Sequence, residues 1–315
     1  MDMEHFYLAL SAVAPLFLSM AAGFLSQKAG ILTREDVPKI NKVAFQVFLP
    51  CLLFYNVYMS DLSSAVRPKL IFFAVAAVLI VFSASVFIAL HWVSEREWRG
   101  VVSQAIFRSN YVIMGVPIAQ ALVGADNLGP VAILVAIVVP LFNFLAVIVL
   151  ESFRGGKAKL GTVLLGIAKN PLIISSLLGI LFLALKLRLP HLLEQSVASL
   201  GGIATPLQLF LLGAFFRFSG LRRYIKPLSA VTGIKLLLTP AVMLGTAAAL
   251  GFRGVEFVAL IGIFASPTAV NSFTMVQQMH CGDAELAGDI VVCTSAFSVL
   301  SLFLWIWIFK SLGMF

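Results

Sequence analysis

The feature that most constrains this chain is an internal repeat, in which residues of the first half recur in the second at a nearly constant offset. At an offset of 156 positions (for example 171 − 15), the recurring pairs are Pro15 and Pro171, Ser19 and Ser175, Gly23 and Gly179, Pro50 and Pro206, Leu53 and Leu209, Phe54 and Phe210, and Arg67 and Arg223. At 157 positions (for example 264 − 107), they are Phe107 and Phe264, Ser109 and Ser266, and Asp126 and Asp283. A duplicated unit with an odd number of membrane spans is inverted relative to its twin, as in secondary transporters.

Composition places the chain in a membrane. Hydrophobic residues make up 61% of it and charged residues only 11%, whereas soluble domains carry about 25% charged residues. The three cysteines stand at unrelated spacings and no two histidines stand at helical ligand spacing, so we expect no disulfide framework, metal site or cofactor. The acidic N-terminus lacks the basic stretch of a secretory signal, so the first apolar segment is predicted to be a retained helix.

Apolar runs of about 20 residues predict an all-α membrane protein with ten transmembrane helices. These spans lie near residues 6–26, 37–59, 68–91, 99–122, 128–151, 162–186, 197–217, 226–250, 256–279 and 285–310. The longest polar link, residues 152–161, falls at the midpoint of the repeat. Residues 1–152 and 153–315 are therefore predicted to be two inverted five-helix repeats.

Basic residues predict how these helices are oriented. Fourteen of the 22 Lys and Arg residues fall on one side of the ten spans and six on the other, with Arg108 and Lys235 left inside spans. Positive residues favour the cytoplasmic side, so both termini are predicted to be extracytoplasmic in a multi-pass protein of the cell membrane. The formal net charge of +8 is then explained by topology, and nucleic-acid binding is not expected.

The fourth and ninth predicted spans carry proline and small polar residues at membrane depth, in segments 107–117 and 264–274. Pro117 and Pro267 each remove a helical hydrogen bond, and Gly115 further weakens the fourth span. Two such interrupted, or broken, helices can cross at the bilayer midplane, where freed amides and helix dipoles suit an anion. The alternative is that both prolines are ordinary kinks.

Two cations are predicted to lie deep in the membrane. Arg108 stands nine residues after Arg99 and Lys235 nine after Lys226, which places each about 13 Å into a hydrocarbon core about 30 Å thick. A charge at this depth costs free energy, so a functional role is the default interpretation of each residue. The alternatives are that its side chain snorkels to the interface or donates hydrogen bonds to carbonyls freed by the broken helices. Acidic residues fall near span ends, which favours an anion as the ligand over a metal or an organic cation.

Asn143, in the fifth predicted span, could line a cavity at the crossing or form a hydrogen bond between two helices.

Two further features are assigned to packing and anchoring. Ser19 and Gly23, with their repeat partners, are predicted to let helices approach closely. Trp305 and Trp307, near the end of the last span, are predicted to be interfacial anchors.

Several of these segments resemble the auxin efflux carrier family. The run from Asn110 to Gly115-Val116-Pro117 resembles the asparagine-then-Gly-x-Pro signature of that family. Residues 41–50 resemble its second span, residues 169–171 its sixth, and residues 266–271 its ninth. The resemblance covers essentially the whole chain.

The resemblance implies a carrier of organic anions, which are auxin in plant members and carboxylates such as malate or malonate in bacterial members. It also implies a scaffold of spans 1, 2, 6 and 7, a mobile transport domain of spans 3–5 and 8–10, and a homodimer formed through the scaffold. By the motif match, Asn110, Pro117 and Pro267 would hold the carboxylate. Plant carriers often have a long loop where residues 152–161 form a short link, so the chain is similar to a compact, bacterial-type member or to a short plant-type one. Auxin itself is therefore not the expected substrate.

These observations predict a secondary transporter that moves small organic anions by elevator-type alternating access. The predicted substrate site consists of Asn110, Arg108, Ser109, Pro117, Pro267, Asn271, Asn143 and Lys235. One alternative is a sodium-coupled bile-acid-type symporter, which needs a cluster of acidic and carbonyl ligands near the crossing. Another is a membrane receptor that binds a ligand without moving it. An intramembrane enzyme is not expected, because no nucleophile–base pair or metal-ligand cluster stands within the spans.

Overall fold

The computed structural model describes residues 2–33, 35–59, 67–124, 127–154, 160–216 and 222–315, and the side chains of all of these except residues 2–13 and 160–163. The described chain is helical and has no strand beyond an isolated backbone bridge. Among its helices, six are long and apolar enough to cross a membrane, which are Asp36–Tyr58, Pro68–Trp92, Gly129–Phe153, His191–Phe215, Ile225–Ala249 and Ala284–Ser311. The chain is therefore an all-helical, multi-pass membrane protein. Asp126 of the repeat and the basic residues Arg34, Lys157, Lys159 and Arg217 lie outside the described residues.

The helices follow the predicted apolar runs closely. In the first half they are α1 (Asp2–Lys28), α2 (Asp36–Val43), η1 (Ala44–Phe48), α3 (Leu49–Tyr58), α4 (Pro68–Trp92), α5 (Arg96–Phe107), η2 (Tyr111–Gly115), α6 (Val116–Val123) and α7 (Gly129–Phe153). In the second half they are α8 (Leu160–Ala168), α9 (Pro171–Ala184), α10 (His191–Phe215), α12 (Ile225–Gly233), η4 (Ile234–Leu238), α13 (Thr239–Ala249), α14 (Gly254–Phe264), α15 (Asn271–Met279) and α16 (Ala284–Ser311). The segments η1, η2 and η4 are π-helical turns.

Each π-helical turn ends two residues before a proline, namely Pro50, Pro117 or Pro240. Proline lacks the N–H that would bond to the carbonyl four residues back, and its ring clashes with that carbonyl. The residue before each proline instead donates to the carbonyl five residues back, as Thr239 does to Ile234. The helix thus passes each proline without a break, by widening for one turn.

Trp305 satisfies the carbonyl that Pro240 leaves free. Its indole N–H donates to the carbonyl of Leu236, four residues before that proline, at 2.8 Å. The ring of Trp305 also stacks on Phe309 at 5.8 Å between centroids. The polar atom of Trp305, which was predicted to be an interfacial anchor, therefore bonds inside the protein.

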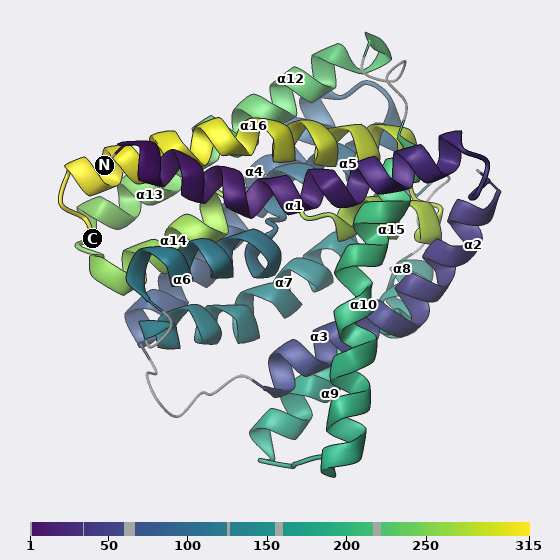
Figure 1. The fold of residues 1–315 in the computed structure, drawn as a ribbon, viewed down its shortest axis with the longest axis horizontal. Helices are drawn as coiled ribbons and strands as arrows, with labels where there is room; N and C mark the ends of the chain where they lie inside the picture. The colour runs from purple at the N-terminus through teal and green to yellow at the C-terminus, as the bar shows by residue number, and fades with distance from the viewer. Residues whose placement is uncertain (1, 34, 60–66, 125–126, 155–159, 217–221) are drawn as a thin grey trace.

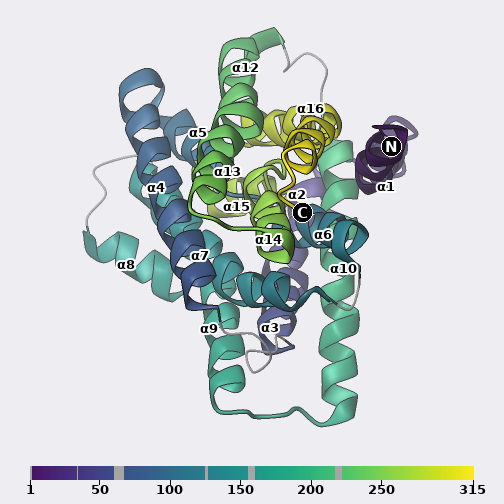
Figure 2. The ribbon, with the colours of Figure 1, turned by 90° about the vertical axis from the view of Figure 1, so that its left-hand side faces the viewer.

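The predicted span at residues 162–186 is not one helix. The described part of α8 ends at Ala168, and α9 begins at Pro171 in a different direction (Figure 2). The side chain of Asn170 accepts a hydrogen bond from Leu172 N at 2.9 Å and so caps α9. Proline at the first helical position and asparagine before it are a typical helix start, and they override the apolar run.

Small residues bring helix backbones together, as predicted for Gly23 and Gly179. A Cβ atom on Gly23 would lie 1.9 Å from the carbonyl oxygen of Phe210, and one on Gly213 would lie 1.9 Å from that of Met20. These two glycines let α1 cross directly over α10 (Figure 1). Gly179 allows a similar approach of α9 to α3.

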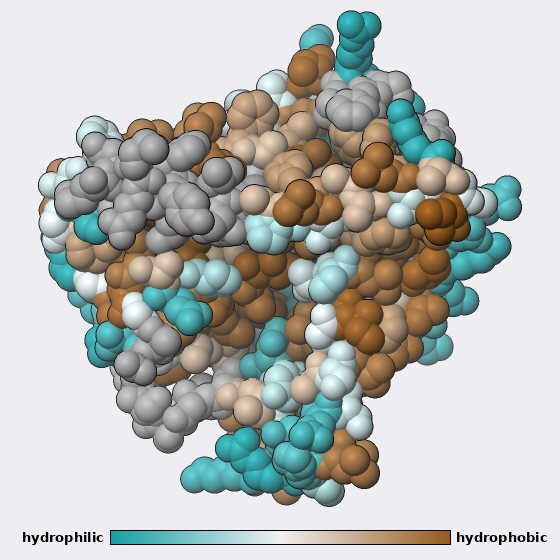
Figure 3. All heavy atoms as spheres, in the orientation of Figure 1, coloured by the Kyte–Doolittle hydropathy of each residue, from teal (hydrophilic) through white to brown (hydrophobic). Residues whose placement is uncertain are grey.

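The arrangement places both chain ends on one side of the molecule. The N- and C-terminal marks lie together at the left of Figure 1, whereas α2, α8 and α15 lie at the right. The helices α3, α9 and α10 project downward in both ribbon views (Figures 1 and 2). Hydrophobic residues cover much of the middle of the face in Figure 3, and hydrophilic residues gather at its right edge and bottom. Apolar side chains such as Phe72, which is 78% exposed on α4, suit contact with lipid.

Candidate functional site

The two interrupted segments meet inside the protein. Ser109 and Thr268 form an antiparallel backbone bridge, and Asn110 N donates to Pro267 O at 2.8 Å. The hydroxyl of Thr268 donates to the carbonyl of Ala105 at 2.9 Å, near the end of α5. Backbone groups at the two breaks thus find partners across them, as membrane depth demands.

The break in the fourth span lies earlier than predicted. The helix α5 ends at Phe107, Arg108 has extended dihedral angles, and Pro117 lies within α6. Pro117 is tolerated there because the π-helical turn before it absorbs the missing hydrogen bond. Gly115 has a packing role rather than a weakening one, since a Cβ atom on it would lie 2.8 Å from the carbonyl oxygen of Gly262. Pro267, in contrast, lies within the break between α14 and α15 as predicted.

Arg108 is a buried cation held by neutral partners. Its side chain is 2% exposed, and its two terminal nitrogens donate to the sulfur of Met275 and to Oδ1 of Asn143. It forms no ion pair with any acid in the described part of the chain. Arg108 therefore neither snorkels nor bonds freed carbonyls. Asn143, on α7, accepts this bond from Arg108 in the break and also lines the cavity described next.

A cavity of about 50 Å³ lies against the break. Its lining residues are Leu49, Leu52, Leu53, Asn56, Arg108, Ser109, Asn110, Tyr111, Val112, Ile113, Val139, Phe142, Asn143, Thr205, Gln208, Ala269 and Asn271. One water needs about 10–15 Å³, so the cavity has room for a few waters or a small ligand. Five of the eight predicted site residues line it. Pro117, Pro267 and Lys235 do not, although Pro267 supports its wall through the bond from Asn110.

Lys235 belongs to a different part of the molecule. It lies in η4, is 1% exposed, and is absent from the cavity wall. Around it, η4 packs against α5, α12, α13 and α16. The structure therefore does not bring Lys235 together with Arg108, because η4 packs against helices that contribute no lining residue to the cavity.

The sequence alone missed the far wall of the cavity, which comes from α3 and α10. Asn56 of α3 and Thr205 and Gln208 of α10 contribute polar side chains there. The repeat had marked both segments through the recurring pair Pro50 and Pro206. That pair indicated equivalent positions, yet it could not show that both segments face the break.

Five polar atoms at this cavity are buried and have no hydrogen-bond partner. They are Ser109 Oγ, Asn110 Nδ2, Asn143 Nδ2, Gln208 Nε2 and Asn271 Oδ1. Buried polar groups are rarely left unpaired, because each costs about 1–3 kcal/mol. Arg108 can only donate, so the atom of Asn143 that it contacts must be the acceptor Oδ1. The Nδ2 group of Asn143 is therefore the donor without a partner. The cavity is therefore arranged to bind a polar ligand.

The charge around the cavity selects the sign of that ligand. Arg108 is its cation, and none of its described lining residues is acidic. The helical stretches that begin at Tyr111 and Asn271 start at the cavity, and helix N-termini carry partial positive charge. No group of three or more His, Cys, Asp or Glu residues that could hold a metal ion occurs among the described residues. The geometry suits a small anion with several acceptor atoms.

Comparisons with known proteins agree with the resemblance seen in the sequence. The family model described as Membrane transport protein, which represents the auxin efflux carrier family, matches residues 8–306. A transporter of Methanothermobacter thermautotrophicus is 25% identical over 300 residues, covering 93% of this chain and 96% of that protein. A Rhizobium meliloti protein named "Putative malonate transporter" is 24% identical over 291 residues, or 90% of each chain. The family and these relatives are transporters rather than enzymes.

Proposed function

Because this chain belongs to the membrane transport protein family, that of the auxin efflux carriers, we propose that it is a secondary carrier of small carboxylates. The observation that carries the proposal is the set of unpaired buried donors beside Arg108, in a cavity without acidic lining residues among those described. A carboxylate would accept hydrogen bonds from Asn110, Asn143 and Gln208, and Arg108 would balance its charge.

The size of the cavity supports a short substrate. Pockets for drug-sized ligands measure about 300–1,000 Å³, whereas this cavity measures about 50 Å³. A malonate-like acid fits this limit better than a bile acid or an indole acid does. The name of the Rhizobium meliloti relative points to the same class of substrate. A sodium-coupled symporter is disfavoured, because the described cavity wall offers no acidic ligand for the ion.

The transport mechanism we propose is alternating access by an elevator-type movement of ten spans in two inverted repeats. In support, α1, α3, α9 and α10 pack mainly on one another, and α4–α7 and α12–α16 do likewise. The first group would be the scaffold and the centre of a homodimer, and the second would be the mobile transport domain. Arg108, Asn110 and Asn143 belong to the second group, so they would move with the substrate past Gln208 of the scaffold. Both termini would be extracytoplasmic in the cell membrane.

Transport by purified protein in proteoliposomes tests the proposal. After a thermal-shift screen of small organic acids, counterflow of the best ligand is measured with and without sodium. We expect sodium-independent counterflow that Asn110→Ala abolishes, because this variant removes an unpaired donor from the cavity. The matched control is Asn127→Ala, an exposed asparagine whose amide donates to the carbonyl of Val123. Unchanged uptake by Asn110→Ala would remove the proposed site, and binding without counterflow would indicate a receptor.

A further inference from the structure

The helix α15 ends in a seam where it meets α2 and the start of α9. We propose that Asn41 and Asn170 hold the last residues of α15, Gln277–Met279, in a latch that closes one end of the substrate cavity and must open for substrate to pass. These contacts are called the α15 latch below. The inference rests on the proposed carrier function and adds the gate that separates its two states.

The first half of the α15 latch is made by α2. The amide of Asn41 donates to Oε1 of Gln277, and the amide of Gln278 donates to the backbone carbonyl of Pro38 at 2.9 Å. Asn41 is fully buried, although it lies only five residues after the start of α2. A buried amide bonded to another amide 236 positions away is not needed to form either helix. It holds the two helices against each other.

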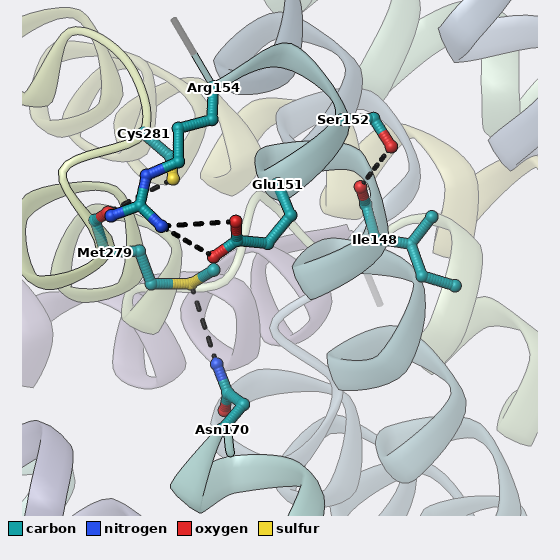
Figure 4. Close-up of polar contacts among 7 residues, drawn as sticks. All are labelled: Ile148, Glu151, Ser152, Arg154, Asn170, Met279 and Cys281. Atoms are coloured by element: carbon teal, nitrogen blue, oxygen red, sulfur yellow. Dashed lines mark hydrogen bonds and ion pairs between the residues drawn. The ribbon is translucent and has the colours of Figure 1, made fainter. Parts of the chain in front are cut away.

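The second half of the α15 latch is made by Asn170. Its Oδ1 atom caps α9, which leaves its amide to point at the sulfur of Met279, 3.7 Å away (Figure 4). The thiol of Cys281 donates to the carbonyl of Met279 at 3.1 Å, and so holds the chain just beyond α15. Burial, with a smaller contribution from Glu151, raises the pKa of Cys281 to about 12, so this thiol keeps its proton at neutral pH.

The α15 latch lies in line with the substrate cavity. Asn41 stands eight residues before Leu49, and Met279 stands eight residues after Asn271, which is about 12 Å along each helix. Leu49 and Asn271 both line the cavity, so α2 with η1 and α15 run side by side from the cavity to the α15 latch. The intervening Phe45 is also buried. The structure is therefore closed at this end.

A basic hollow lies on the outer side of the α15 latch. It measures about 480 Å³, and its lining includes Lys39, Lys42, Gln277, Gln278 and His280. Solvent thus reaches the outer surface of the α15 latch, which separates this hollow from the substrate cavity. Positive side chains concentrate anions near them, so a carboxylate leaving or entering here would meet a favourable field. The geometry is that of a gate with a basic vestibule.

Neither Asn41 nor Asn170 lines the substrate cavity, so the substrate site gives these two residues no role. Asn41 opens the segment 41–50, and Asn170 lies in the segment 169–171. The two segments are far apart in the chain, and the structure brings both of them to the same three residues of α15. A single function for the two segments explains this convergence.

A reversible cross-link tests the α15 latch. In a background with Cys51→Ala, Cys281→Ser and Cys293→Ala, the pair Asn41→Cys and Gln277→Cys is bridged with a short bis-methanethiosulfonate reagent. We expect counterflow to fall at least tenfold and to return after reduction, while the thermal shift caused by the substrate persists. The control is the pair Leu79→Cys and Ser83→Cys, one turn apart on the exposed face of α4, which should leave counterflow unchanged. If the cross-linked carrier shows the same counterflow as the carrier without the cross-link, the inference is overturned.

A second measurement does not depend on transport. A lost side-chain hydrogen bond shifts an opening equilibrium about two- to tenfold. Gln277→Ala should therefore speed amide hydrogen exchange over residues 275–279 by about that factor, whereas the exposed Gln195→Ala should not. Unchanged exchange with Gln277→Ala would also overturn the inference. If the unmodified carrier shows no counterflow of any carboxylate, the proposed function fails instead, whatever the exchange result.

Discussion

Arg108→Met separates a ligand-binding cation from a structural one. Methionine keeps most of the apolar length of arginine and removes its charge. In the structure, Arg108 is 2% exposed, has no acidic partner among the described residues, and bonds to Asn143 and Met275. A hydrogen bond to a charged group contributes about 1.5–3 kcal/mol. Loss of such a bond to a bound carboxylate would weaken affinity about 10- to 150-fold.

The stability of the ligand-free protein should change little in this variant. Asn143 loses its hydrogen-bond partner, which costs about 1–3 kcal/mol of stability. Removing a buried cation that has no counter-ion relieves a desolvation cost, and this gain offsets that loss. At a ligand concentration of about 100 times Kd, binding stabilises the wild-type protein by about 2.7 kcal/mol. If the affinity of the variant is 100-fold weaker, binding at the same ligand concentration stabilises it by only about 0.4 kcal/mol.

The assay is thermal unfolding in detergent with and without the acid found by screening. We expect Arg108→Met to melt near the wild-type temperature without ligand and to lose most of the ligand-induced shift. Arg108→Lys keeps the charge but not the planar fork of donors, so it should retain part of the shift. A low melting temperature together with an intact ligand shift would show that Arg108 is structural and would refute the reasoning.

Three further predictions concern packing, thiol reactivity and the break. Gly23→Ala places a methyl group 1.9 Å from a backbone oxygen of α10 and should lower the free energy of unfolding by about 1–3 kcal/mol, measured by thermal unfolding. The control Gly202→Ala meets nothing within 4 Å and should change the free energy of unfolding little. The pKa of Cys281 is raised from 9.0 to about 12, which leaves about a thousandfold less thiolate at pH 8. Labelling of Cys281 by iodoacetamide should therefore be slow and should become faster as the pH rises. It should also be faster in Glu151→Gln, because that substitution removes a charge that raises this pKa. Thr268→Val removes a 2.9 Å bond to a carbonyl of α5 and should cost about 1–3 kcal/mol in the same unfolding assay.

The helices of this protein were largely predictable because each depends on a local run of apolar residues. The π-helical turns and the start of α9 were not, although the prolines and Asn170 that produce them are visible in the sequence. A proline in a membrane helix has several outcomes, and the neighbouring groups decide among them. At Pro240 the helix widens and Trp305 takes up the free carbonyl, whereas at Pro267 the helix breaks.

The candidate site was predicted in part. Arg108, Ser109, Asn110, Asn143 and Asn271 were identified from charge, polarity and the position of the break, and they do line one cavity. Lys235 satisfied the same criterion of a deep charge and lies elsewhere. Depth along a span is readable from the sequence, but the direction in which a side chain points depends on the packing of its helix.

What the sequence by itself determined is the membrane environment, the extent of most helices, the repeat and the two segments whose helices are broken. These follow from hydrophobicity, chain length and the proline and small polar residues of the two segments, which act over a few helical turns. In the fourth span, however, the break precedes Pro117. The tertiary structure alone decided that Gln208 lines the same cavity as Asn110, that Asn143 holds Arg108, and that Asn41 holds the end of α15. The physical reason is that such contacts join residues up to 236 positions apart, and their geometry exists only after the helices have packed.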